Sequence, residues 1–265
     1  MKQPLLTVIT ILCGIFVCRA QTAMAEVTER KVEYRDGNAK LVGYEIADTA
    51  RTEKLPGVII FSDWMGIGAF AKERGRELAS LGYRAFVADI YGNAKQAANM
   101  EEAGALATKI KSDRKLFRSR ARAAFDVFSQ SALVDSSKIA AIGFCFGGTA
   151  SLELARTGAP LRGLVSFHGG LNTDDLTLSK NIRGRVLVLH GADDPLVPRA
   201  EVEAFREEMR RGGVAWELHE YGGAVHSFTN PDAGNDLSKG FAYNKSVAER
   251  SYREMREFFG EVFGS

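Results

Sequence analysis

The sequence contains few cysteines, and their positions matter more than their number. Only Cys13, Cys18 and Cys145 occur in 265 residues, and the first two lie in an N-terminal segment that we expect to be removed. A mature chain with one thiol has no intramolecular disulfide, even in an exported compartment that favours disulfides. Because serine or alanine would pack equally well and a lone thiol risks oxidation, the presence of Cys145 indicates chemistry rather than packing.

The sequence also lacks a strong net charge. The formal charge of the whole chain is +2, and Lys2 and Arg19 are the only charged residues among the first 25. Without those two residues the rest of the chain is formally neutral. Such a balance argues against nucleic acid or an acidic surface as the main partner. The basic residues between 114 and 122 are typical of a solvated helix face.

Long apolar runs are absent except at the N-terminus. Residues 5–17 form an apolar run that follows Lys2, and this run is shorter than the ~20 residues that a membrane-spanning helix needs. Residues 23–25 then give the small-x-small pattern of a cleavage site. The combination predicts a secretory signal peptide over residues 1–25.

Removal of that peptide leaves residues 26–265, a length typical of one large α/β domain. We therefore expect a periplasmic or secreted protein with no stable membrane association after cleavage. The alternatives are cleavage after Ala20, an uncleaved anchor, and a lipoprotein signal at Cys18, before which Val17 is larger than such signals usually have.

Apolar runs alternate with amphipathic stretches through the mature chain, without repeats, linkers or low-complexity segments. The predicted strands are 32–34, 41–46, 57–61, 85–88, 139–142, 164–167, 186–189 and 216–221, with a turn at 36–38 and helices that include one near 94–110 and one at the C-terminus. Strands that alternate with helices imply an α/β fold, with a mostly parallel central sheet covered by helices on both faces.

Polar residues gather directly after the predicted strands. They are Asp63 and Trp64, Tyr91, Cys145, His168, Asp193 and Asp194, and His226. Ligands bind at the carboxyl ends of the strands in open α/β sheets. We therefore expect these residues to share one rim of the sheet.

The segment 143–148, with the sequence GFCFGG, lies between a predicted strand and a predicted helix. A strand, a sharp turn and a helix with a nucleophile at the turn form a nucleophile elbow, here with Cys145 in place of the commoner serine. Gly143 and Gly147 remove the Cβ atoms that would collide in such a turn. The helix N-terminus favours the thiolate. The plainer interpretation is a small buried cysteine between packing glycines.

A thiol nucleophile benefits from a histidine base and from a carboxylate that orients the base, and in α/β-hydrolases these follow the nucleophile in the order acid, histidine. Asp194 is favoured over Asp193, which we assign to the turn, although both could be exposed turn residues. His226 lies in a loop and is favoured over His219, which lies within a strand.

The remaining histidines, His168 and His190, precede loops and are candidate supporting donors. No pair of the four histidines has the i, i+4 spacing of a helical ligand set. We therefore expect no metal and no cofactor.

Three segments carry a resemblance to a known family: 143–148, the GADDPLVP sequence at 191–198, and YGGAVHSF at 221–228. On these motifs the chain resembles the dienelactone hydrolase family of the α/β-hydrolase fold over nearly all of the mature protein. The resemblance implies a Cys145–Asp194–His226 triad. It also implies an oxyanion hole made by the backbone N–H groups of Trp64 and Phe146.

Two positions depart from the best-known members of that family. Those members carry a glutamate after the third strand, and the matching residue here is Asp63, which is one methylene shorter. Those members also hold the substrate carboxylate with two arginines, and the matching residues here are Asn93 and Asn230. Asparagine does not supply that charge, so dienelactone itself is not the expected substrate.

Several apolar residues are candidates for a pocket wall, although each could equally belong to the core: Trp64, Met65, Tyr91, Phe144 and Phe228. The loop 230–244 could be a small lid or a plain surface loop.

Together these features predict a hydrolase of ester or lactone bonds that acts on a small molecule through a thioester intermediate. The alternative is a non-catalytic member of the same fold that binds a small ligand or a partner. The sequence gives no indication of the oligomeric state.

Overall fold

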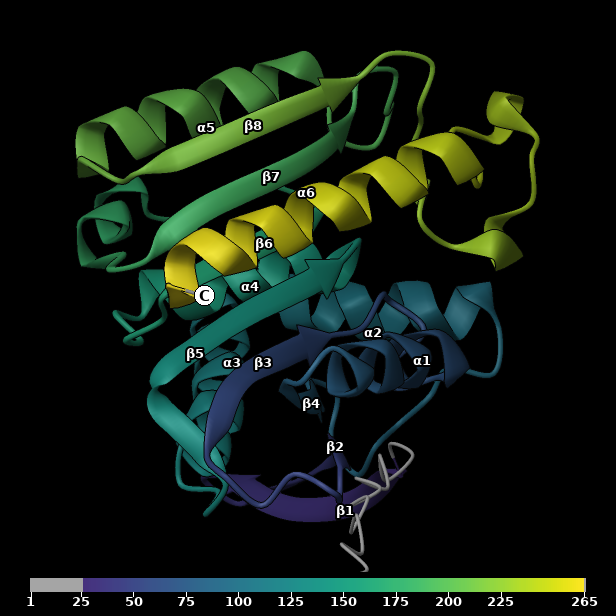
Figure 1. Ribbon diagram of the computed structural model, residues 1–265. Helices are drawn as coiled ribbons and strands as arrows, with labels where there is room; N and C mark the ends of the chain where they lie inside the picture. The colour runs from purple at the N-terminus through teal and green to yellow at the C-terminus, as the bar shows by residue number, and fades with distance from the viewer. Residues whose placement is uncertain (1–25, 265) are drawn as a thin grey trace, which may run out of the picture.

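A computed structural model describes residues 26–264, so the predicted signal peptide lies outside the described residues. The chain forms one eight-stranded sheet in the order β1-β2-β4-β3-β5-β6-β7-β8 (Figure 1). The strands are β1 (Val27–Asp36), β2 (Ala39–Asp48), β3 (Leu55–Phe61), β4 (Arg84–Ala88), β5 (Val134–Phe144), β6 (Gly163–Phe167), β7 (Arg185–Gly191) and β8 (Trp216–Tyr221). Strands β3 to β8 are parallel, and β1 and β2 join antiparallel at one edge. The predicted mostly parallel sheet is confirmed.

Helices cover both faces of the sheet, as predicted (Figure 1). The α-helices are α1 (Ala69–Ser80), α2 (Met100–Ser112), α3 (Arg114–Phe128), α4 (Phe146–Arg156), α5 (Arg199–Gly212) and α6 (Lys245–Phe263), and the short 3-10 helices are η1 (Leu176–Asn181), η2 (Pro231–Ala233) and η3 (Leu237–Lys239). One core cluster joins the sheet to α2, α3, α4 and α5, and a second joins the other face to α1 and α6.

The central strands are buried on both faces. Ile59, Ile60 and Phe61 of β3 are inaccessible to solvent, and alternate side chains of this strand enter the two core clusters. Burial of each such side chain stabilises the fold by about 1.5–3 kcal/mol. The carboxyl ends of these strands are therefore held rigidly at one rim.

The opening hairpin is longer than predicted. Its strands pair from Val27 with Asp48 to Asp36 with Ala39, around the predicted turn. Strand β1 is an edge strand whose side chains are mostly exposed and polar, so a prediction based on apolar residues finds only its centre.

The helix predicted near 94–110 begins later, at Met100. Asn93 and Ala94 have positive φ angles of 53° and 52°, which a helix does not allow. The Asn99 side chain then accepts a hydrogen bond from the Glu102 N–H at 2.9 Å and caps the helix.

The basic residues of α3 are not a freely solvated face. Arg118 pairs with Glu153 and Asp174, each at 2.7 Å, and Arg120 pairs with Asp36 at 3.0 Å. Carboxylates of neighbouring elements thus neutralise these residues, which the sequence interpretation missed because the partners lie far away in the chain.

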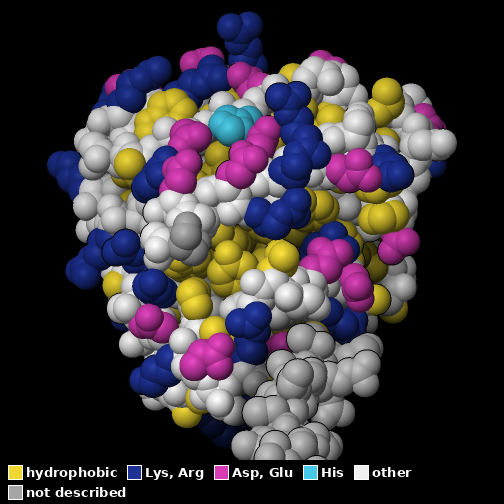
Figure 2. Space-filling view, viewed as in Figure 1, with side chains coloured by type: hydrophobic (Ala, Val, Ile, Leu, Met, Phe, Trp, Pro, Cys, Tyr) yellow, Lys and Arg dark blue, Asp and Glu magenta, His cyan; other side chains and the backbone are white. Residues whose placement is uncertain are grey.

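Charges of both signs are intermixed on the face shown in Figure 2, and apolar side chains are visible near its centre. Within residues 26–264, no helix has both the length and the apolar character needed to cross a membrane.

Candidate active site

Cys145 stands between the end of β5 and the start of α4, in the sharp turn that the sequence predicts. Its backbone has φ 54° and ψ −117°, a conformation that costs of order 1–3 kcal/mol for a residue other than glycine. A Cβ on Gly143 would lie 1.8 Å from the Gly147 carbonyl oxygen, and a Cβ on Gly147 would lie 2.1 Å from that of Phe61. Only glycine fits at these two positions, and the packing brings the loop after β3 against the turn.

The thiol of Cys145 is free and half-buried. Two rings lie close to it, those of His226 and Tyr91. Burial raises the pKa of Tyr91 above its ordinary value, and the charges of Cys145 and Asp63 raise it further. The surroundings of the sulfur are therefore partly apolar and partly charged.

His226 is oriented by a carboxylate. Its Nδ1 lies 2.8 Å from Oδ2 of Asp194, and the other Asp194 oxygen accepts a hydrogen bond from the Leu196 N–H at 2.8 Å. Asp194 and His226 are both buried. The Nε2 atom of His226 is also buried but has no hydrogen-bond partner among the described residues. A polar atom left in this state is costly unless a reacting group uses it.

The charge state of His226 follows from its neighbours. Burial opposes a positive charge on the ring, but the Cys145 sulfur and the Asp194 carboxylate more than offset it and raise the pKa of His226 to about 10. The imidazole therefore holds a proton at neutral pH, in a site where the Asp194 carboxylate and the Cys145 sulfur both favour that form.

Asp193 and His219, the less favoured candidates, lie outside this cluster. Asp193 is exposed and accepts a hydrogen bond from the Gly223 N–H at 2.9 Å, which fixes the neighbouring turn. His219 lies on β8, and its Nδ1 is 2.7 Å from a carboxylate oxygen of Glu254 on α6. The structure thus brings Asp194 rather than Asp193 to His226.

A second histidine lies against Cys145. His168 follows β6, is almost completely buried, and has a positive φ of 40°. Its Nδ1 accepts a hydrogen bond from the Cys145 N–H at 3.2 Å, and its Nε2 lies 2.7 Å from Oγ1 of Thr229. Burial, and then the positive charge of His226, keep the pKa of His168 well below its ordinary value. His168 is therefore neutral and has no free nitrogen.

Two backbone N–H groups at or near the elbow have no hydrogen-bond acceptor among the described residues. Phe146 is the first residue of α4, and neither its N–H nor that of Trp64 has an acceptor among residues 26–264. The Tyr91 hydroxyl donates to the Trp64 carbonyl oxygen at 2.8 Å and so orients the loop after β3. Unsatisfied donors at a helix N-terminus suit a developing oxyanion.

Asp63 lies near the cluster. Its Oδ1 accepts a hydrogen bond from the Met65 N–H at 2.9 Å. Burial raises the pKa of Asp63, Asp232 raises it further, and His226 lowers it. Two carboxyl groups are thus neighbours on this side of His226.

The sequence matches the dienelactone hydrolase family over residues 43–263. The chain belongs to the dienelactone hydrolase family. It is therefore a hydrolase that acts on ester or lactone bonds, and its fold is the α/β-hydrolase fold.

Solved structures support this assignment for the whole domain. The chain is 43% identical to a dienelactone hydrolase-like promiscuous phosphotriesterase from metagenomic libraries, with a TM-score of 0.86 and coverage of 90% of this chain and 99% of that chain. It is 42% identical to a structure named m3DLH, with a TM-score of 0.85 and coverage of 89% and 98%.

A curated relative from Bradyrhizobium sp is 29% identical over 209 residues, which cover 74% of this chain and 83% of that protein. It is named "Probable 2-oxo-3-(5-oxofuran-2-ylidene)propanoate lactonase".

The two asparagines of this dienelactone hydrolase family member lie at different depths. Asn93 is exposed after β4. Asn230 is half-buried, and its Oδ1 accepts a hydrogen bond from the Asp232 N–H at 3.0 Å, which begins η2. The Asn230 side chain is thus committed to the local turn.

Two candidates for the pocket wall belong to the core. Phe144 and Phe228 are inaccessible to solvent. Phe228 packs edge-on against His168 with ring centroids 4.9 Å apart, so it supports the site from behind. Trp64, Met65 and Tyr91 are half-buried and are the wall candidates that retain exposed surface.

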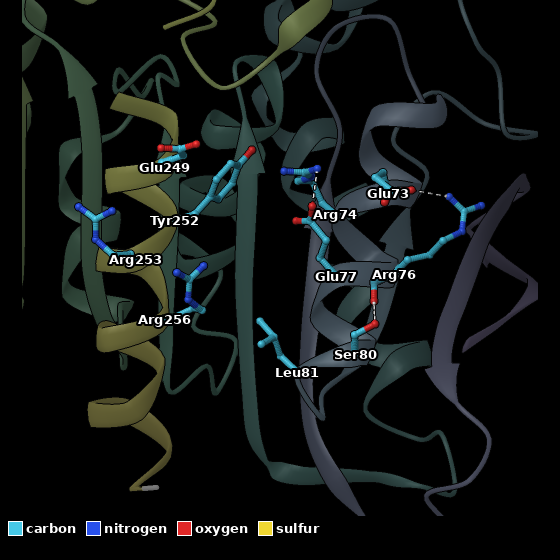
Figure 3. A pocket seen from close by; sticks show the side chains of 10 residues that line it. All are labelled: Glu73, Arg74, Arg76, Glu77, Ser80, Leu81, Glu249, Tyr252, Arg253 and Arg256. Atoms are coloured by element: carbon cyan, nitrogen blue, oxygen red, sulfur yellow. Dashed lines mark hydrogen bonds and ion pairs between the residues drawn. The ribbon is translucent and has the colours of Figure 1, made fainter. Parts of the chain in front are cut away.

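A groove of about 620 Å³ lies between α1 and α6 (Figure 3), and Trp64, Met65 and Tyr91 are not among the residues that line it. Its lining is mostly charged, and Tyr252 projects from α6 into it, toward Arg74 (Figure 3). Among the described residues, no three histidine, cysteine, aspartate or glutamate side chains are grouped to hold a metal ion.

Sequence reasoning did not find two residues of the site, Thr229 and Asp232. The sequence contained a signal for Thr229, because this residue directly follows the family-like segment 221–228 and lies three residues after His226. The effect of Asp232 on the pKa of Asp63 depends on how the loop after β8 folds back, which no local pattern indicates.

Proposed function

We propose that this protein hydrolyses neutral ester or lactone bonds, with Cys145 as nucleophile, His226 as acid and base, and Asp194 as the residue that orients His226. The observation that carries the proposal is the buried Nε2 atom of His226, which has no hydrogen-bond partner in the described part of the chain while Nδ1 is held by Asp194. A triad needs this arrangement, with one ring nitrogen fixed and the other available.

The first half-reaction forms a thioester. The thiolate of Cys145 attacks the carbonyl carbon, and the π electron pair moves onto the carbonyl oxygen, where the N–H groups of Trp64 and Phe146 stabilise it. Collapse of this intermediate breaks the C–O bond. The His226 imidazolium gives its proton to the departing alkoxide.

The second half-reaction restores the enzyme. Neutral His226 takes a proton from water while the water oxygen attacks the thioester carbon. Collapse expels the Cys145 thiolate and releases the carboxylic acid, and the thiolate again faces the protonated imidazole.

The charge of the surroundings favours neutral substrates. Asp63 is half-buried near Asp232, and asparagines occupy positions 93 and 230. A substrate carboxylate would meet two acidic groups and no matching arginine at those positions, and like charges in a partly buried site repel.

Substitution of the nucleophile tests the reaction. Cys145→Ala should reduce kcat/KM for neutral p-nitrophenyl esters and simple lactones by at least about 10⁴-fold. Cys145→Ser keeps the size of the side chain but not the thiolate, and should lose at least about 10²-fold. Cys145→Ala with wild-type activity would exclude the proposal. A wild-type protein with neither esterase activity nor a thiol reactive toward iodoacetamide would favour the ligand-binding alternative.

Phosphotriesters are a second candidate substrate class. The support is the 43% identity, over 90% of this chain, to the structure named as a promiscuous phosphotriesterase. Paraoxon hydrolysis by wild type, compared with Cys145→Ala, tests this candidate. Release of p-nitrophenol that does not depend on Cys145 would exclude it.

We also propose export, on the basis of the charged, apolar and small-x-small pattern in residues 1–25. Expression of the full chain in a bacterium with two membranes should yield a periplasmic product that begins at Glu26. An intact N-terminus on a protein confined to the cytoplasm would contradict this.

A further inference from the structure

We propose that His168 and Thr229 form a positioning pair that sets the distance between the Cys145 nucleophile and the His226 imidazole. This inference rests on the proposed function, because it concerns the same cysteine and histidine. The pair does not touch substrate. It joins the backbone of the nucleophile to the loop that carries the base.

The hydrogen bonds of His168 fix its tautomer. Its Nδ1 accepts from the Cys145 N–H at 3.2 Å, so the ring proton is on Nε2 and is donated to Oγ1 of Thr229 at 2.7 Å. The Cys145 N–H also donates to the Phe167 carbonyl oxygen at 3.0 Å. His168 thus adds a side-chain contact at the one residue of the elbow whose φ is unfavourable.

Both ends of the pair are buried. His168 and Thr229 each expose 2% of their surface. Thr229 lies three residues after His226, and the intervening Phe228 packs edge-on against the His168 ring. The rings of His168 and His226 also meet edge-on, with centroids 5.3 Å apart. A movement of His168 would therefore move the backbone of Cys145, the ring of His226, or both.

His168 acts here without titrating. The titratable groups around its ring are Cys145 on the elbow, His226 on the loop after β8, and His190 at the end of β7. Behind Thr229, the hydroxyl of Tyr252 on α6 and the guanidinium of Arg74 on α1 complete the polar surroundings. No carboxylate among the described residues faces His168, and burial with the charge of His226 outweighs the one backbone hydrogen bond that favours a charged ring.

Near-isosteric variants test the pair. Thr229→Val removes the acceptor, Thr229→Ser keeps it, and His168→Asn keeps only the acceptor for the Cys145 N–H. We expect Thr229→Val and His168→Asn to lower kcat for a neutral ester about tenfold with KM little changed, because misplacement of reacting groups costs rate. Thr229→Ser should restore most of the rate.

The rate of iodoacetamide alkylation against pH gives a readout that needs no substrate. The midpoint of this profile should move upward by about one unit in Thr229→Val and His168→Asn, as expected for a tenfold weaker contact between the sulfur and the imidazolium. Thr149→Val is the matched control. Thr149 is also buried, and its hydroxyl donates to the Gly170 carbonyl oxygen at 2.9 Å in the loop after β6, without a hydrogen bond to His168.

The outcomes separate the inference from the proposed function. If wild type lacks esterase activity but its alkylation profile shifts in the two variants, the proposed function fails and the positioning pair stands. If wild type is active while folded Thr229→Val and His168→Asn match it in kcat and alkylation midpoint, the positioning pair is overturned. Equal shifts in Thr149→Val, or a change in melting temperature alone, would reduce the pair to a structural contact and also overturn it.

Discussion

The two ends of α4 each contain a buried polar cluster, and the clusters differ in how completely they are paired. At the C-terminal end, Arg156 is inaccessible to solvent and binds Glu208 through Nε and Nη2 at 2.9 and 2.7 Å, Glu153 at 2.9 Å, and the Leu171 carbonyl oxygen at 3.0 Å. At the N-terminal end, His226 keeps one buried nitrogen without a partner in residues 26–264, beside a cysteine with strained backbone.

The difference indicates what each cluster does. A buried guanidinium whose carboxylates and carbonyl are all in place holds α4 against α5 and the loop after β6. A buried nitrogen without a partner is costly to the fold and valuable to a reaction. The first cluster should therefore govern stability with little effect on rate, and the second should govern rate with little effect on stability.

The largest effect is expected from removal of His226, the proposed base. His226→Asn should lower kcat for a neutral ester by about 10³–10⁴-fold, because Asp194 then has no imidazole to orient and the thiol has no proton acceptor. Steady-state kinetics with a thermal melt checks this. A loss in kcat below tenfold would contradict the division between the clusters. So would a fall in melting temperature large enough for unfolding alone to explain the lost rate.

The next effect concerns the other end of the helix. Arg156→Met should lower the free energy of unfolding by about 3–5 kcal/mol, because it leaves Glu208 buried without its charge partner. Urea denaturation measures this, and the remaining folded protein should hydrolyse esters at the wild-type rate. Adding Glu208→Leu should recover most of the loss. If the double variant is as unstable as the single one, the packing and other contacts of Arg156, rather than its ion pair with Glu208, hold the helix.

A smaller effect is expected in the pH dependence of stability. Burial opposes charge on His226, but Cys145 and Asp194 raise its pKa to about 10. Because the folded value exceeds the ordinary value, the stability that this group contributes is fully present below about pH 6.5 and is lost as the pH rises through about 10. Wild type should therefore lose more stability than Cys145→Ala between pH 7 and 10.5 in urea titrations. Parallel curves for the two proteins would refute the pairing of sulfur and imidazolium.

The smallest effect should come from the carboxylate beside the site. Asp63→Asn removes an acidic group from a half-buried position, so kcat/KM for a succinate monoester should rise a few-fold relative to that for the neutral acetate. The same ratio in Glu261→Gln, which removes a negative charge beside Arg185 at the start of β7, is the control. If Asp63→Asn leaves the ratio of the two kcat/KM values unchanged, charge repulsion does not explain a preference for neutral substrates.

Local patterns predicted the parts of the molecule that depend on local geometry. The elbow at 143–148 follows from glycines that no other residue can replace, and the sheet follows from the alternation of apolar strands with helices. Asp194 rather than Asp193 lies beside His226, as expected from its place in the loop. The functional roles of these residues remain predictions.

Contacts between distant segments could not be predicted in this way. The hydrogen bond from Cys145 to His168 requires the β5–β6 register, in which Phe144 pairs with Phe167. The carboxylate partners of Arg156 and of α3 depend on how helices pack across the sheet. A sequence pattern shows that these side chains are charged, but only the packing shows what neutralises them.

The backbone of His226 is attached to the far end of the loop that follows it. Its N–H donates to the Gly240 carbonyl oxygen at 3.2 Å, and its carbonyl oxygen accepts from the Ala242 N–H at 3.0 Å. The mostly exposed residues 231–239 form a loop whose far end is held against the His226 backbone by these two hydrogen bonds. Natural or engineered variants could therefore lengthen or exchange this loop while both backbone hydrogen bonds of His226 stay in place.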